Sequence, residues 1–185
     1  ISDNNRNLQL TIDLDIENKV REVLASEKYK DFNNIGVTIM EADTGKIKAM
    51  VQKDESEANV NLGIEGNGYE PGSVFKLITL ASALDKGLVT MNDKYTCTGK
   101  ICGLGIHGTQ TVEQALLNSC NDVYAAVGEK VGYVTMMDYC KKLGLFSKVL
   151  NVTAPRQNET EGIAPDIEDG MANISIGQCM TLSPL

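Results

Sequence analysis

A predicted β-hairpin over residues 35–51 is the feature that most restricts the fold of this 185-residue chain. Residues 35–40 are rich in strand-forming side chains, residues 43–45 read Asp-Thr-Gly, and residues 46–51 resume the alternation of polar and apolar side chains. Gly45 can supply the unusual backbone angle that a tight hairpin turn requires. The chain is therefore expected to contain an antiparallel element rather than helices alone.

Helical periodicity dominates most of the remaining chain. Before the hairpin, residues 8–13 alternate like a short strand, and apolar residues at helical spacing then predict a helix that runs to about residue 30. The other expected helices are 73–87, 111–117, 123–131 and 136–143, with a Gly-rich loop at about 96–109. The balance is mostly helix, with a small antiparallel element near the start.

Composition narrows the class of function. The chain is 42% apolar and 23% charged, which is ordinary for a soluble globular protein. Its net charge of -8 and its scattered basic residues argue against a nucleic-acid partner, because phosphate binding needs a concentrated Lys/Arg surface. No stretch approaches a membrane span or a signal-type start. Residues 1–7 are expected to be a linker.

Ser73 and Lys76 form the candidate catalytic pair. They lie three residues apart at a predicted helix start, so one turn brings the hydroxyl and the amine onto the same face. A serine needs an adjacent base to act as a nucleophile, and a lysine can be that base only if its pKa is lowered. The helix N-terminus would favour an oxyanion beside Ser73. A helix cap beside an exposed lysine would explain the same pair without catalysis.

Ser119-Cys120-Asn121 is the second candidate element, about 45 residues further along and between two predicted helices. Its serine could relay a proton to a leaving amine, and its asparagine could hold a substrate amide. A pair of helix-terminal caps is the alternative. Together with Ser73 and Lys76, the catalytic interpretation is favoured.

Residues 69–76 (Tyr-Glu-Pro-Gly-Ser-Val-Phe-Lys) resemble the nucleophile motif of penicillin-binding proteins, which combine Ser-x-x-Lys with a Ser-x-Asn and a Lys-Thr-Gly element. Other segments resemble the same family in the same order, namely 8–13, 42–50, 107–117, 159–165 and 175–184. The arrangement is similar to that of the class B, monofunctional enzymes, including clostridial and sporulation-type members. The chain contains no Lys-Thr-Gly or Lys-Ser-Gly, an element that the family carries on a strand beyond this point.

The resemblance implies an α+β fold of the β-lactamase/transpeptidase type, with a helical subdomain and an antiparallel sheet flanked by helices. Residues 1–185 would be the N-terminal part of one transpeptidase domain. Residues 8–90 would hold the first strand, the hairpin and the nucleophile helix, and 91–185 a mostly helical subdomain. The sheet would be incomplete, so we expect the chain to need the C-terminal half of the domain for stability and to be inactive alone.

The implied activity is that of a serine-type D,D-transpeptidase that cross-links peptidoglycan stem peptides and is acylated by β-lactams. Ser73 would be the nucleophile, Lys76 its base and Ser119 the proton relay. Asn121 would complete the catalytic set, and Ser119 and Asn121 would both bind substrate. The enzyme would require no cofactor. It would serve cell-wall synthesis and cell shape, in growth or in sporulation, with partner proteins of wall synthesis. A β-lactam sensor without turnover and a serine β-lactamase are the alternatives.

The family also implies a location on the extracytoplasmic face of the bacterial membrane. The protein would be anchored there by an N-terminal segment upstream of Ile1.

Cys97, Cys102 and His107 form a compact group in the Gly-rich loop before Ser-x-Asn. Thiolate and imidazole ligands at this spacing suit structural zinc, with Cys120 or Asp93 as the fourth ligand. A Cys97–Cys102 disulfide, which an exported protein would favour, and free thiols are the alternatives. Five cysteines are an odd number, so the chain is not a disulfide-stapled scaffold. A metal here would stabilise the side of the site formed by residues 119–121, the Ser-x-Asn wall, and would take no part in the reaction.

Overall fold

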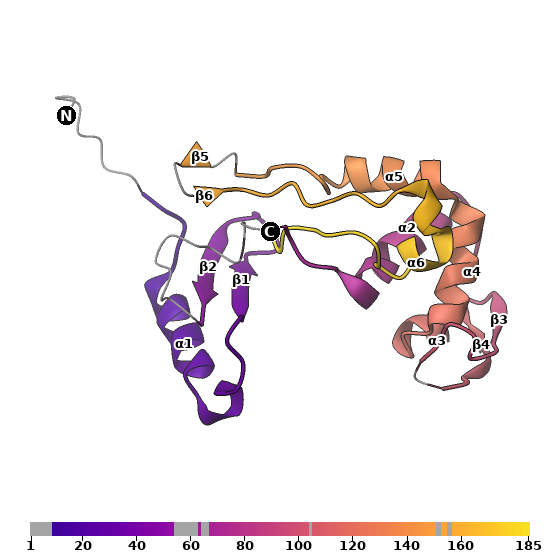
Figure 1. Ribbon diagram of the computed structural model, residues 1–185, viewed down its shortest axis with the longest axis horizontal. Helices are drawn as coiled ribbons and strands as arrows, with labels where there is room; N and C mark the ends of the chain where they lie inside the picture. Colours follow the sequence, from indigo (N-terminus) through magenta and orange to yellow (C-terminus); the bar gives the residue numbers. More distant parts are fainter. Residues whose placement is uncertain (1–8, 54–62, 64–66, 104, 151–152, 155–156) are drawn as a thin grey trace. The chain divides into compact units, whose positions relative to one another are not determined.

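The computed structural model describes residues 9–53, 63, 67–103, 105–150, 153–154 and 157–185 (Figure 1). These residues form two compact units. The first comprises residues up to 66 with 152–159 and 184–185, and the second comprises 67–151 and 160–183. No helix in the described ranges is both long and apolar enough to cross a membrane.

The first unit is built on the predicted hairpin. Strand β1 (Gly36–Met40) pairs antiparallel with β2 (Ile47–Gln52), with Val37 opposite Val51. Gly45 has a φ of +69°, so the prediction of a glycine-dependent turn is confirmed. One face of the hairpin packs on helix α1 (Leu14–Leu24) through a small apolar cluster. A two-residue pair, β5 (Thr153–Ala154) and β6 (Gln157–Asn158), also belongs to this unit.

Two boundaries in this unit differ from the predictions. Helix α1 ends at Leu24, and only a 3₁₀ turn, η1 (Glu27–Tyr29), follows toward residue 30. Residues 9–13 form no strand, although Asp13 N–H donates to the Lys48 carbonyl (2.8 Å). Asp13 instead caps α1 by accepting hydrogen bonds from the N–H groups of Asp15 and Ile16. The capping side chain ends the extended segment before a ladder can form.

The second unit is mostly helical and is built around α4 (Asn121–Val131), which packs against α2, α3, α5 and α6 (Figure 1). The other helices are η2 (Gly72–Phe75), α2 (Lys76–Asp85), α3 (Val112–Leu117), α5 (Tyr133–Lys142), η3 (Ile167–Asp169) and α6 (Met171–Ile174). Its core includes Phe75, Tyr124, Met136 and Ile174, each no more than 1% exposed.

Local signals set the helix boundaries in this unit. Gly87 and Gly144 have positive φ values just after α2 and α5, as the sequence predicted for helix stops. Helix α3 begins with a reciprocal capping box between Thr111 and Gln114. The prediction of a Gly-rich loop over 96–109 is partly wrong. The two ends of this range belong to the antiparallel strands β3 (Lys94–Cys97) and β4 (Gly108–Thr111). Four-residue strands carry too little alternation to be recognised in the sequence.

Candidate active site

Ser73 and Lys76 lie where the 3₁₀ turn η2 runs directly into α2. The turn is held in place from the C-terminal segment, because Gly72 N–H donates to the Gly177 carbonyl oxygen at 3.0 Å. A Cβ atom at Gly177 would lie 2.1 Å from the carbonyl oxygen of Gly72, so only glycine permits this approach. The Ser73 side chain is exposed, whereas Lys76 is 1% exposed. The hydroxyl is thus accessible and the amine is enclosed.

The Lys76 amine joins the two predicted elements. Its Nζ atom lies 2.9 Å from Ser73 Oγ, 3.0 Å from Ser119 Oγ, 2.9 Å from the Ser119 carbonyl oxygen and 2.6 Å from Asn121 Oδ1. The structure therefore brings together all four residues that the sequence proposed as catalytic.

Four oxygen neighbours are more than a lysine amine can satisfy as a donor. An ammonium has three N–H donors, and a neutral amine has two N–H donors and one lone pair. The Ser119 carbonyl and the Asn121 Oδ1 atom can only accept, so they take two N–H groups. What remains of the amine faces two hydroxyls, Ser73 and Ser119. A neutral Lys76 could accept a proton from either one.

Burial lowers the pKa of the Lys76 ammonium below its ordinary value, against the opposing effect of the nearby Cys102 and Cys120 sulfurs. A lowered pKa increases the fraction of neutral amine at a given pH. The environment of Lys76 thus acts in the direction that a general base requires.

Ser119 is placed by a strained turn. It has a φ of +51°, which is uncommon for a residue other than glycine, in the short link between α3 and α4. With this conformation both its carbonyl oxygen and its hydroxyl lie within hydrogen-bond distance of Lys76 Nζ. Such backbone strain costs on the order of 1 kcal/mol and is concentrated at functional sites.

The cysteine and histidine side chains also lie close together, and one of them, Cys120, is the middle residue of Ser-x-Asn. One ligand atom from each of Cys97, Cys102, His107 and Cys120 lies within 4.8 Å of all the others. His107 Nδ1 is 3.6 Å from Cys97 Sγ and 3.4 Å from Cys102 Sγ. No disulfide joins any of the five cysteines, all of which lie in the described part of the chain. Among the residues that the structure describes, these four side chains form a group that could hold a tetrahedral metal.

Of the two candidates for a fourth ligand, Cys120 lies in this group. The alternative, Asp93, instead accepts hydrogen bonds from Thr90 N–H (3.1 Å) and Thr90 Oγ1 (2.7 Å) and is not part of the group. Cys120 is fully buried, and burial raises the pKa of its thiol to about 12. Hydrogen bonding from the His107 backbone lowers the pKa of Cys97.

Sequence reasoning missed Asp122, which follows Asn121 directly. Its carboxylate accepts six hydrogen bonds from the loop that carries Cys102. Burial acts to raise its pKa, but hydrogen bonds from Ile101 and Thr98 oppose this, and the net pKa lies well below the usual value. No sequence signal marked it, because an acidic residue in the first turn of a helix is common.

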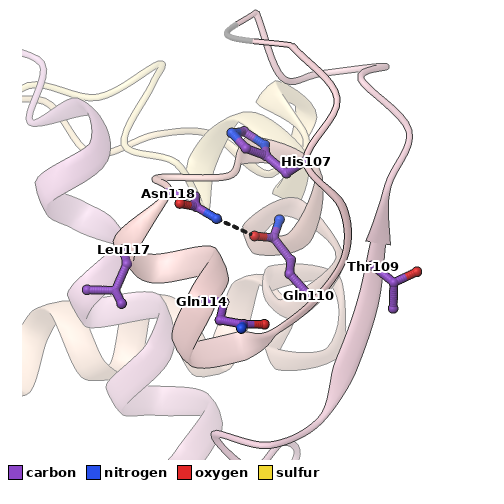
Figure 2. Close-up of a pocket in the computed structure, with 6 residues that line it drawn as sticks. All are labelled: His107, Thr109, Gln110, Gln114, Leu117 and Asn118. Carbon is purple, nitrogen blue, oxygen red and sulfur yellow. Dashed lines mark hydrogen bonds between the residues drawn. The ribbon is translucent and has the colours of Figure 1, made fainter.

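A polar cavity of about 340 Å³ lies beside β4 and α3 (Figure 2). It is lined by His107, Thr109, Gln110, Gln114, Leu117 and Asn118. Asn118 Nδ2 donates to Gln110 Oε1 at 2.9 Å, as Figure 2 shows. Ser73 and Lys76 are not among its lining residues, so this cavity is separate from the nucleophile.

The C-terminal segment meets two other segments that carry the family resemblance. Leu182 and Tyr69, the first residue of the 69–76 motif, exchange two backbone hydrogen bonds of 2.9 Å and 2.8 Å. Ile163 pairs in the same way with Thr181. Parts of the chain more than a hundred residues apart in sequence are thereby joined beside the turn that carries Ser73.

Comparison with known proteins agrees with this geometry. Residues 35–185 match the protein-family model of the penicillin-binding protein transpeptidase domain. Stage V sporulation protein D of Bacillus subtilis is 29% identical over 96% of this chain and 31% of its own length. Penicillin-binding protein PbpB of Mycolicibacterium smegmatis is 27% identical over the same shares of the two chains. The chain thus spans about a third of the length of these curated relatives.

Solved structures show the same fold. Penicillin-binding protein A of Mycobacterium tuberculosis, solved as a ceftriaxone acyl-enzyme complex, matches with a TM-score of 0.75 and 26% identity, over 97% of this chain and 48% of the other. A peptidoglycan glycosyltransferase from Burkholderia ambifaria matches with a TM-score of 0.78 and 23% identity, over 95% and 57% of the two chains. The α+β transpeptidase fold that the sequence predicted is confirmed, and the chain belongs to the penicillin-binding protein transpeptidase family.

Proposed function

We propose that this chain supplies the nucleophile and the Ser-x-Asn wall of a serine-type peptidoglycan D,D-transpeptidase. The observation that carries the proposal is the single amine of Lys76, within 3.0 Å of oxygen atoms from Ser73, Ser119 and Asn121. An enclosed amine with a lowered pKa, next to an accessible hydroxyl, is the arrangement that serine activation needs. The substrate would be the D-Ala-D-Ala end of a stem peptide.

The first half-reaction is acylation. Neutral Lys76 takes the hydroxyl proton as Ser73 Oγ forms a bond to the carbonyl carbon of the D-Ala-D-Ala peptide bond. When the C–N bond breaks, the proton passes from Lys76 through the Ser119 hydroxyl to the leaving amine of D-Ala. The Asn121 amide orients the substrate through the part of its side chain that Lys76 does not engage.

The second half-reaction consumes the acyl-enzyme. The amine of a neighbouring stem peptide attacks the ester carbon, a new amide C–N bond forms as the ester bond to Ser73 Oγ breaks, and the proton lost by the amine returns to Ser73 Oγ. A β-lactam enters the same first step, but its C–N bond lies in a ring, so the amine stays attached to the acyl group. No cofactor enters either step.

The experiment that tests this proposal is mass spectrometry of the full-length protein after treatment with benzylpenicillin. One penicilloyl adduct that maps to Ser73 is expected, and it should be absent from Ser73→Ala and retained in the matched control Ser26→Ala, which removes an exposed hydroxyl of the other unit. An adduct on the Ser73→Ala protein would refute the assignment. Rapid hydrolysis of the adduct would favour a β-lactamase, and a stable adduct without cross-linking activity would favour a sensor.

We also propose that Cys97, Cys102, His107 and Cys120 bind one structural zinc ion. The donor set is the three-cysteine, one-histidine combination of closed structural sites, and all four ligand atoms are already gathered within 4.8 Å. Three of the ligands come from the β3–β4 segment and Cys120 is the middle residue of Ser-x-Asn. The ion would therefore tie that segment to the wall that holds Ser119 and Asn121.

Metal analysis of the full-length protein, purified with a thiol reductant and without chelator, tests the zinc proposal. One zinc per chain is expected, with loss in Cys102→Ser and retention in Cys179→Ser, whose parent thiol is exposed and outside the group. Protein that is folded, reduced and free of zinc would contradict the proposal. A mass two units lower in protein purified in parallel without reductant, mapped to a Cys97–Cys102 disulfide, would identify the alternative.

We place this activity on the extracytoplasmic face of the membrane, where peptidoglycan is assembled, in a protein held by an N-terminal anchor and working with other wall-synthesis proteins. The sporulation protein among the relatives supports a role in sporulation. Fluorescent-penicillin labelling of intact cells should then label this protein most strongly during sporulation, and labelling confined to growing cells would contradict that setting.

A further inference from the structure

We propose that Asp122 is a positioning residue for acylation, which locks the 98–102 loop onto the first turn of α4 and so holds Asn121 against Lys76. The inference rests on the proposed function, in which Ser73 is acylated with Lys76 as its base. It concerns a side chain that touches neither Ser73 nor Lys76 in the described contacts.

The carboxylate of Asp122 is enclosed by the loop in front of it. Oδ2 accepts from Thr98 N (2.7 Å), Thr98 Oγ1 (2.9 Å), Gly99 N (2.9 Å) and Lys100 N (3.3 Å), and Oδ1 accepts from Ile101 N (2.7 Å) and Cys102 N (3.0 Å). Five successive backbone N–H groups thus converge on one carboxylate. Loops with successive N–H groups turned inward are anion-binding nests, and here the protein supplies the anion itself.

The position of Asp122 in the helix links this nest to the active site. Asn121 and Asp122 are the first two residues of α4. Successive residues of an α-helix point about 100° apart, so the two side chains leave the same turn in different directions. The Asn121 side chain reaches Lys76 Nζ at 2.6 Å, while that of Asp122 reaches the loop. The first turn of α4 is therefore fixed from two sides.

The site requires a carboxylate rather than an amide. Both oxygens accept, four hydrogen bonds on one and two on the other. An asparagine at position 122 would turn its NH₂ group toward some of the backbone N–H groups of residues 98–102. Those N–H groups would then have no acceptor at a partly buried position. The loop would then separate from the helix, and the first turn of α4 would lose one of its two fixed sides.

The test compares Asp122→Asn with Asp93→Asn in the full-length protein. Asp93 is a matched control, because its carboxylate also closes a turn in the same unit but accepts its hydrogen bonds from Thr90 rather than from the 98–102 loop. Stopped-flow acylation with a chromogenic cephalosporin separates the first-order acylation constant from the dissociation constant. Both are measured well below the melting temperature of every variant.

The acylation constant of Asp122→Asn should fall by about 10- to 100-fold, with a smaller change in the dissociation constant, because misplacing a catalytic group by about 1 Å costs this much. Asp93→Asn should acylate at the parental rate. Asp122→Glu, which keeps the charge and both oxygens, should recover part of the loss. A folded Asp122→Asn protein with the parental acylation constant, or an equal fall in Asp93→Asn, would overturn the inference.

A second variant covers the case in which Asp122→Asn does not fold. Thr98→Val removes one donor, Oγ1, and keeps the backbone N–H groups of the nest, so a smaller fall in the same constant is expected. An unchanged constant in Thr98→Val would then overturn the inference. Ser73→Ala keeps the two proposals apart, because an adduct in that variant refutes the proposed function whatever Asp122 does.

Discussion

Lys76 Nζ lies 2.6 Å from Asn121 Oδ1, the shortest of its four oxygen contacts, and this pair joins the start of α2 to the start of α4. The two residues are 45 positions apart in the sequence. Besides its proposed contact with the substrate, Asn121 therefore accepts a hydrogen bond from one N–H group of the buried amine. The amine that remains is directed to the hydroxyls of Ser73 and Ser119.

Removal of the Asn121 side chain should lower the acylation constant. We expect Asn121→Ala to lower the acylation constant by about 10- to 100-fold, because the amine of Lys76 loses one of the contacts that orient it. Asn118→Ala is the control, since Asn118 is exposed and contacts Gln110 rather than Lys76. Equal acylation constants for the two variants, measured with the same β-lactam, would contradict this role.

The acylation constant should rise with pH until Lys76 is neutral. Only the neutral amine can take the serine proton, and burial lowers the pKa of Lys76 from its ordinary value of 10.5. The midpoint of the rise should therefore lie below pH 10.5. A pH–rate profile of acylation measures it, with Ser73→Ala as the blank. A rate that is flat across this range, or that rises only above pH 10.5, would show that Lys76 is not the base.

The hydroxyl of Tyr124 is buried in the core of the second unit, and no hydrogen-bond partner for it is found among the described residues. Burial also raises its pKa to about 12. We expect Tyr124→Phe to leave the free energy of unfolding unchanged or to raise it by about 1 kcal/mol, since an unpaired buried hydroxyl costs stability.

Tyr133→Phe is the matched comparison. Its hydroxyl donates to the Pro165 carbonyl at 2.9 Å, so the same substitution should lower the free energy of unfolding by about 0.5–1.5 kcal/mol. Urea unfolding of both variants gives the two values. A larger loss for Tyr124→Phe than for Tyr133→Phe would reverse the expectation.

Gly128 marks the closest approach of α4 to the segment after α6. A Cβ atom there would lie 1.5 Å from Ser175 Oγ, so Gly128→Ala requires backbone movement and should cost about 1–3 kcal/mol. Gly103→Ala is the control, because a Cβ atom at Gly103 meets nothing within 4 Å. Thermal melting should show a clear fall for the first variant and little change for the second. Equal melting temperatures would show that α4 and this segment can separate without cost.

Much of the site could be predicted because its signals are local. Ser73 and Lys76 are three residues apart, and helical geometry alone brings such a pair together. The β1–β2 hairpin and the helix stops at Gly87 and Gly144 likewise depend on a few neighbouring residues. The strand expected at 8–13 is not formed by residues 9–13, because the Asp13 side chain caps α1 and begins a helix there.

Other features depended on contacts between distant residues. The choice of Cys120 over Asp93 beside Cys97 and His107 was open in the sequence, and the packing of α4 against β3 decided it. The six donors around Asp122 come from residues 20 to 24 positions away, and no sequence pattern next to Asp122 predicts these hydrogen bonds.

The sequence by itself thus predicted that Ser73 and Lys76 share one helical face and that a hairpin precedes them, because both follow from short-range spacing or period, and its resemblance to the family predicted the α+β fold. Only the tertiary structure decided which oxygens surround Lys76, which side chains could hold a metal, and what fixes the first turn of α4. These depend on the packing of α2, α4 and the β3–β4 segment, and side chains meet there through burial and hydrogen bonding across the fold, which spacing along the chain does not encode.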